Sequence, residues 1–78
     1  MFAGYVTTLK GTKVHGSFAA GEASWCRSVR QGSTFTVVAE WSGEVTDAAQ
    51  ALQEAGVQST SVCESCLGGV KAEMELAG

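Results

Sequence analysis

The sequence predicts a small α+β domain, in which an antiparallel sheet of three to four strands packs against one main helix. Three observations support this fold class. The first half of the chain contains short runs of aromatic and β-branched residues separated by glycines, which is typical of strands joined by turns. Residues 45–55 follow the 3.6-residue hydrophobic period of an amphipathic helix. The chain has only 78 residues, so residues 1–78 are expected to form a single domain with a thin core.

Four segments are candidates for the strands. Residues 2–9 are rich in aromatic and β-branched types, and Gly11 suits the turn that follows them. Residues 13–18 and 23–29 are short runs joined by four residues, which predicts a hairpin. Residues 34–41 alternate most regularly. One face of this last strand would carry Phe35, Val37, Ala39 and Trp41.

The strongest helix candidate is residues 45–55. Its apolar stripe would consist of Val45, Ala48, Ala49, Leu52 and Ala55. Ser42 or Thr46 would cap the first turn. Asp47 suits that turn because a carboxylate interacts favourably with the helix dipole, and Gly56 suits the position just after the helix.

The C-terminal segment 70–77 is compatible with two structures. Its apolar residues alternate as in a strand, whereas its residue types are strong helix formers. We favour a second helix, because a helix often follows a Cys-x-x-Cys in zinc sites. Residues 57–62 are expected to be extended, and Gly68 and Gly69 would let the chain bend after the second cysteine.

The residues best suited to carry chemistry are three cysteines and one histidine. Cys63 and Cys66 form a Cys-x-x-Cys, whose spacing lets both sulfurs reach one ion. A tetrahedral site needs two more ligands, and the chain offers His15 and Cys26, both on the predicted hairpin. Neighbouring positions of an antiparallel pair lie close enough to share an ion. The sequence therefore predicts a zinc site that is structural, because four protein ligands leave no open coordination position.

Two other interpretations of the thiols stay open from the sequence. Buried free cysteines behave as small hydrophobic residues, so the three thiols would then be structural without a metal. Alternatively, Cys63 and Cys66 would form a disulfide or a redox pair, although the acidic Glu64 between them disfavours a thiolate.

Three short motifs carry a family resemblance. They are Val14-His15, then Trp25-Cys26-Arg27, then Cys63-Glu64-Ser65-Cys66-Leu67. Their order resembles small, uncharacterised zinc-binding proteins of actinobacteria and their phages, which have a Val-His near the start, a Cys-Gly-Arg further on and a Cys-x-x-Cys-Leu near the end. The resemblance implies the same four zinc ligands and no particular activity.

The net charge of −3 is unevenly distributed. Residues 1–32 carry four basic residues against one acid, whereas residues 33–78 carry one lysine against seven acids. Simple solvation accounts for both halves, but the basic residues, beside several aromatic side chains, are also candidates for binding nucleic acid. These basic residues are Lys10, Lys13, Arg27 and Arg30. The acidic half is a weaker candidate for a surface that mimics nucleic acid.

The chain lacks the sequence motifs of several classes of enzyme. There is no Gly-rich phosphate-binding loop, and the single histidine has no nucleophile elbow beside it. We therefore expect no enzymatic activity. No basic and apolar N-terminal signal and no run of 18 apolar residues are present. We accordingly expect neither a signal peptide nor a membrane span, and a cytoplasmic protein.

The function that these observations favour is a small protein-interaction module with a structural zinc site. Taken with the resemblance, the protein would be encoded by a phage or mobile element and would bind and inhibit a host complex, such as defence or transcription machinery, in the host cytoplasm. One alternative is a nucleic-acid-binding protein that uses the basic N-terminal hairpin. The other is a Cys-x-x-Cys thiol–disulfide redox protein.

Overall fold

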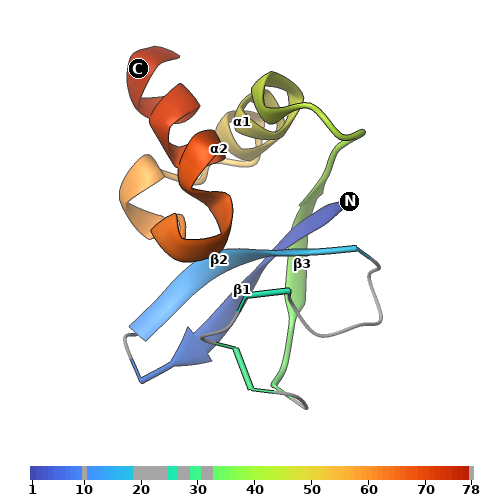
Figure 1. Cartoon of the computed structure of the whole chain (residues 1–78), viewed down its shortest axis with the longest axis vertical. Helices are drawn as coiled ribbons and strands as arrows, with labels where there is room; N and C mark the ends of the chain where they lie inside the picture. The colour runs from blue at the N-terminus through green and yellow to red at the C-terminus, as the bar shows by residue number, and fades with distance from the viewer. Residues whose placement is uncertain (10, 19–24, 27–28, 31–32, 78) are drawn as a thin grey trace.

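The computed structural model describes residues 1–9, 11–18, 25–26, 29–30 and 33–77 (Figure 1). Within these residues a sheet of three strands is followed by two helices and one short 3-10 helix. The elements are β1 (Phe2–Thr8), β2 (Gly11–Ser17), β3 (Thr36–Glu40), α1 (Val45–Glu54), η1 (Ser59–Ser61) and α2 (Glu64–Ala77). The predicted α+β class is confirmed.

The sheet has the order β2-β1-β3 and is antiparallel throughout. β1 and β2 form a tight hairpin in which Thr8 is paired with Gly11. Gly11 has a φ of 103°, a left-handed conformation that glycine adopts without the steric cost of a Cβ. The predicted turn at this glycine is therefore confirmed. Because β1 also pairs with β3, it lies in the centre of the sheet.

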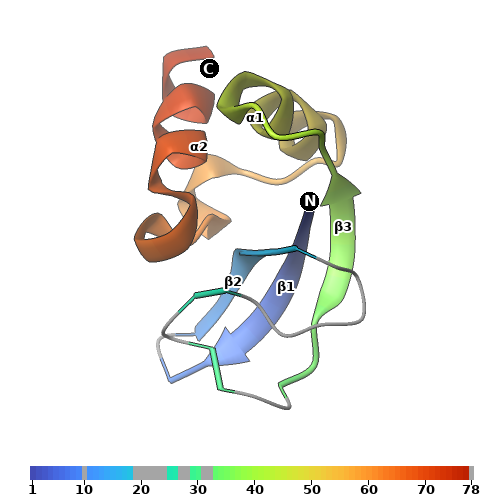
Figure 2. The same ribbon diagram turned by 45° about the vertical axis from the view of Figure 1, so that its right-hand side comes forward.

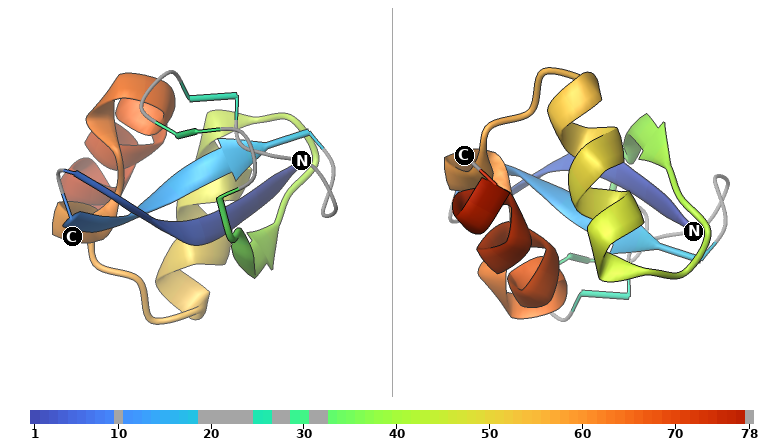
Figure 3. Two further views of the ribbon diagram at one scale, coloured as in Figure 1. Left: turned by 90° about the horizontal axis from the view of Figure 1, so that it is seen from below. Right: turned by 90° about the horizontal axis from the view of Figure 1, so that it is seen from above.

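Both helices cover one face of the sheet (Figures 1 and 2). Seen from the helix side, α1 and α2 lie over the strands, and the view from the other side shows the sheet in front of them (Figure 3). α1 packs on β3 and α2, and α2 packs on β2. The core between these layers contains Ala3, Val14, Trp41, Ala48, Ala49, Leu52, Val57, Val62, Leu67, Val70 and Met74.

The predicted hairpin between 13–18 and 23–29 is wrong where the structure describes it. The antiparallel partner of β2 is β1, because only two residues separate the end of β1 at Thr8 from the start of β2 at Gly11. Trp25, Cys26 and Val29 lie outside any strand. Residues 23–24 and 27–28, which belong to the same prediction, lie outside the described residues.

A bulge in β3 disturbs the alternation that the sequence predicts. Ala3 of β1 is paired with Ala39, but the next residue, Gly4, is paired with Val37. Val38 is therefore an extra residue in β3. Val37 is consequently 41% exposed, whereas Val38 and Ala39 both pack against the core.

Helix α1 agrees with the prediction in its interior and at its C-terminus. Ala48, Ala49 and Leu52 are buried and Gly56 has a φ of 81°, as expected for the residue after the helix. The apolar stripe is narrower than predicted, because Val45 and Ala55 are exposed.

The start of α1 differs from the prediction. Neither Ser42 nor Thr46 is the N-cap, which is Glu44 without a side-chain capping hydrogen bond. Gly43 precedes it with a φ of 87°, so the backbone turns into the helix one residue after Ser42. Asp47 lies in the first turn, as expected.

The C-terminal segment forms a helix, which confirms the favoured alternative, but α2 begins at Glu64, earlier than predicted. It is interrupted at Leu67, whose φ of −124° and ψ of 34° are not helical. The bend thus lies before Gly68 and Gly69, and neither glycine has a positive φ. The preceding segment is less extended than predicted, since Ser59–Ser61 form η1. Among the described residues, no helix has the length and hydrophobicity needed to cross a membrane.

Gly69→Ala is expected to stabilise the protein by about 0.5–1 kcal/mol, because alanine costs less backbone entropy in a helix. A Cβ at this position would meet the Val45 methyl carbons at 3.8 and 3.9 Å, which is ordinary van der Waals contact. Urea unfolding of the two proteins would measure the change. Gly56→Ala is the matched control and should be destabilising, because its φ is 81°. A lower unfolding midpoint for Gly69→Ala would contradict the expectation.

Candidate metal centre

The candidate site lies at the outer edge of β2. The Val14 carbonyl accepts a hydrogen bond of 2.9 Å from the Cys63 amide, and the Gly16 carbonyl accepts one of 3.2 Å from the Trp25 amide. Both carbonyls face away from β1, because alternate residues of an edge strand present their backbone groups outward. The two chain segments that carry the cysteines are thus fixed on either side of His15.

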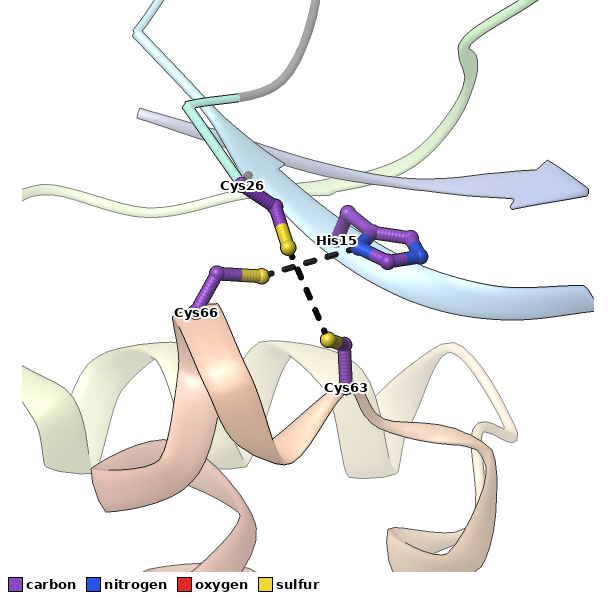
Figure 4. Close-up of side chains that lie close together, drawn as sticks. All are labelled: His15, Cys26, Cys63 and Cys66. Atoms are coloured by element: carbon purple, nitrogen blue, oxygen red, sulfur yellow. Dashed lines mark hydrogen bonds between the residues drawn. The ribbon is translucent and has the colours of Figure 1, made fainter. Parts of the chain in front are cut away.

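Four side chains from these segments converge on one point (Figure 4). His15 comes from β2, Cys26 from the segment after it, and Cys63 and Cys66 from the start of α2. Their ligand atoms all lie within 4.8 Å of one another. The Cys26 and Cys63 sulfurs are 3.8 Å apart, and the Cys66 sulfur is 3.7 Å from His15 Nδ1.

These two separations match the edges of a zinc tetrahedron. With Zn–S bonds of about 2.3 Å and Zn–N bonds of about 2.0–2.1 Å, two sulfurs are about 3.8 Å apart and a sulfur and a nitrogen about 3.6 Å apart. His15 and Cys26 are 1% and 4% exposed, and Cys63 and Cys66 are half-buried. The four residues can therefore hold a metal ion such as zinc.

The start of α2 favours a thiolate at Cys63. Burial acts to raise the pKa of Cys63, but this effect is outweighed by hydrogen bonds to its sulfur. The donors are the backbone amides of Cys66 and Ser65 and the thiols of Cys26 and Cys66, and the net result is a pKa below the ordinary thiol value. A Cys-x-x-Cys that enters a helix supplies these amides through its own first turn.

Burial shifts the pKa values of Cys66 and His15 in opposite directions. Burial raises the pKa of Cys66, and the charges of Cys63 and Cys26 raise it further, while a backbone hydrogen bond from Gly16 acts in the other direction. Burial lowers the pKa of His15, which keeps the imidazole neutral. A neutral imidazole is the form that binds metals, and a divalent cation would offset the repulsion between neighbouring thiolates.

Trp25 positions the site, a role that the sequence analysis did not assign. Its indole Nε1–H donates to the Cys66 carbonyl over 3.4 Å. Its ring packs beside Trp41 and Phe18, with ring centroids 6.3 and 4.8 Å away. The signal in the sequence was its place directly before Cys26, where a large, partly buried ring helps to fix the backbone of a ligand.

The structure unites the four predicted ligands, whereas it describes only two of the four residues of the predicted basic surface. Lys13 donates from Nζ to the Thr60 carbonyl over 2.9 Å, and Arg30 is exposed. Lys10 and Arg27 lie outside the described residues. Of the aromatic side chains that could have stacked on bases, Trp41 is buried and Tyr5 and Trp25 pack partly against the core.

Comparison with known proteins gives no relative: no family model, no curated protein and no solved structure matches this chain significantly. The metal site is therefore argued first from the geometry of the chain's own residues.

Proposed function

We propose that the protein is a small protein-interaction module, not an enzyme, whose fold is stabilised by one zinc ion bound to His15, Cys26, Cys63 and Cys66. One observation carries the proposal. Ligand atoms from three separate segments of the chain lie within 4.8 Å of one another, and two of their separations, 3.8 and 3.7 Å, match the edges of a zinc tetrahedron. The resemblance to small zinc-binding proteins of actinobacteria and their phages supports the same ligands.

The donor set supports zinc. Three sulfurs and one imidazole are soft to borderline ligands, which favour zinc over the hard cations magnesium and calcium. Four protein ligands fill a tetrahedral shell and leave no place for a substrate or water, so the ion would be structural.

The position of the ion explains its value to this fold. It would join the outer edge of β2 to the first turn of α2, next to the hydrogen bond between Cys63 and Val14. A domain of 78 residues has a small core, and such domains often depend on a metal or disulfides. The zinc would thus hold the helical layer on the sheet.

With the ion enclosed, the function would lie on the surface. Leu9, Phe18 and Leu76 are 99%, 70% and 82% exposed, and we propose these individual apolar side chains as contacts with a protein partner. Following the resemblance, we propose a host complex, such as defence or transcription machinery, as that partner. Binding would inhibit it in the host cytoplasm.

The two alternatives have less support. A redox role needs Cys63 and Cys66 as a free pair, yet both sulfurs lie among two further ligands. A nucleic-acid role depends on a basic surface, of which the described residues include only Lys13 and Arg30.

Native mass spectrometry of freshly reduced protein is expected to show one zinc ion per chain. Cysteine alkylation should be slow in this form and should become complete after a strong chelator is added, because zinc-bound thiolates are protected. A metal-free protein would contradict the proposal. Rapid alkylation followed by reversible disulfide formation at Cys63 and Cys66 would instead support the redox alternative.

A further inference from the structure

The second ring nitrogen of His15 is buried and has no hydrogen-bond partner among the described residues. Nδ1 faces the Cys66 sulfur, whereas Nε2 is turned away from the three sulfurs (Figure 4). When Nδ1 binds a metal, the neutral ring carries its proton at Nε2, which is then a donor. Metal-bound histidines almost always give this proton to an acceptor. The described part of the chain supplies none, so the site lacks an acceptor for this donor.

His15 is among the residues that line a pocket of about 230 Å³ beside the metal centre, although its Nε2 is itself shielded from solvent. Lys13 and Lys71 and the hydroxyl residues Thr8 and Ser65 also line the pocket. Glu64 is the one carboxylate among its lining residues. The pocket is smaller than the roughly 300–1,000 Å³ of typical sites for drug-sized ligands, so it suits a small ion or a single terminal group.

The charges of the lining favour an oxyanion, provided that it is small. The lining contains two lysines and one carboxylate, so it has a net positive charge of one. Lys13 already donates to the Thr60 carbonyl, but an ammonium has three donors. The nearby zinc–thiolate centre would carry one negative charge and opposes an anion, so binding would depend on directed hydrogen bonds more than on net charge.

We propose that this pocket binds a phosphate group, either as the free ion or as the terminal group of a small phosphomonoester. Its oxygens would accept from the ammonium groups of Lys13 and Lys71 and, after a small movement of the lining that uncovers it, from His15 Nε2. The inference rests on the proposed zinc site, because the metal at Nδ1 places the proton on Nε2. The metal centre would then have a second role, which is to fix the proton on a donor beside a ligand pocket.

The test is an NMR titration of the zinc-loaded protein with inorganic phosphate and, separately, with methyl phosphate, at constant ionic strength. Zinc content is first measured for each variant. We expect saturable shifts at the His15 ring nitrogen Nε2 and at the Ser65 and Lys71 amides. Lys71→Gln should weaken binding about tenfold, because it removes one charge-assisted hydrogen bond. Glu64→Gln should tighten binding, since it removes the opposing carboxylate.

Arg30→Gln is the matched control, because Arg30 is an exposed basic residue that does not line the pocket. It should leave the affinity unchanged. Equal weakening by Arg30→Gln and Lys71→Gln would show a nonspecific charge effect and overturn the pocket. Zinc-loaded protein without saturable shifts would also overturn the pocket while leaving the zinc site intact, whereas protein that fails to load zinc would refute the proposed function itself. Binding of both phosphates would assign a phosphomonoester site, and binding of inorganic phosphate alone a site for the free ion.

Discussion

Cys63→Ser is expected to abolish zinc binding and to leave most of the protein unfolded at room temperature. Structural zinc contributes about 10–16 kcal/mol of binding free energy in small zinc-dependent peptides, while whole domains are stable by only about 5–15 kcal/mol. Loss of one ligand from the cluster therefore removes a contribution as large as the total stability. The serine is nearly isosteric, so the substitution itself leaves little cavity.

Cys63 is the most informative ligand to remove because its backbone role survives the change. Its amide donates to the Val14 carbonyl at 2.9 Å, and serine retains that amide. Its sulfur lies 3.8 Å from the Cys26 sulfur, and the change affects only the contacts of this sulfur, which are the thiol and amide hydrogen bonds and the metal bond. The expected drop in stability can thus be assigned to the sulfur.

Chelation supplies the control for this variant. Urea unfolding followed by circular dichroism should give the same low midpoint for Cys63→Ser and for the wild-type protein in excess chelator. The variant should not respond to the chelator, because it has no metal to lose. A wild-type midpoint that is insensitive to chelation would refute the structural role of the metal.

The ligand set could be predicted because the chain holds only three cysteines and one histidine. The spacing of Cys63 and Cys66 is local, and a local spacing fixes the positions of both sulfurs. The route that brings His15 and Cys26 to them was predicted wrongly. It is not a hairpin, but a pair of hydrogen bonds to the Val14 and Gly16 carbonyls. Cys63 and Val14 are far apart in the chain, and no local sequence pattern predicts their contact.

In the fold, too, several features set by local sequence were predicted correctly, whereas features set by contacts between distant residues were missed. Leu52 and Gly56 were placed correctly, because the helical period and the left-handed glycine are local properties. The bulge at Val38 was missed, since it depends on how β3 registers with β1. Glu44 as the N-cap was also missed, because Gly43 turns the chain after Ser42 and no side chain caps the helix.

Gly16→Ala is expected to destabilise the protein by about 1–3 kcal/mol, as overpacking in a filled core does. It should also weaken zinc binding about tenfold or more, as the loss of an outer-shell contact does. A Cβ on Gly16 would overlap the six-membered ring of Trp25. That ring must then move away from the Cys66 carbonyl to which it donates. Zinc affinity from competition with a chromogenic chelator, together with urea unfolding, would measure both effects.

Two comparisons separate the clash from a general effect of alanine. Gly68→Ala is the matched control near the site, because its added Cβ would come no closer than 3.9 Å to the Glu64 side chain. It should leave zinc affinity unchanged. Gly16→Ala should also lose most of its effect in a Trp25→Ala background, since the overlapping ring is then gone, and contacting residues are not additive. If Gly16→Ala were equally damaging in both backgrounds, the Trp25 ring would not be what requires glycine beside the metal centre.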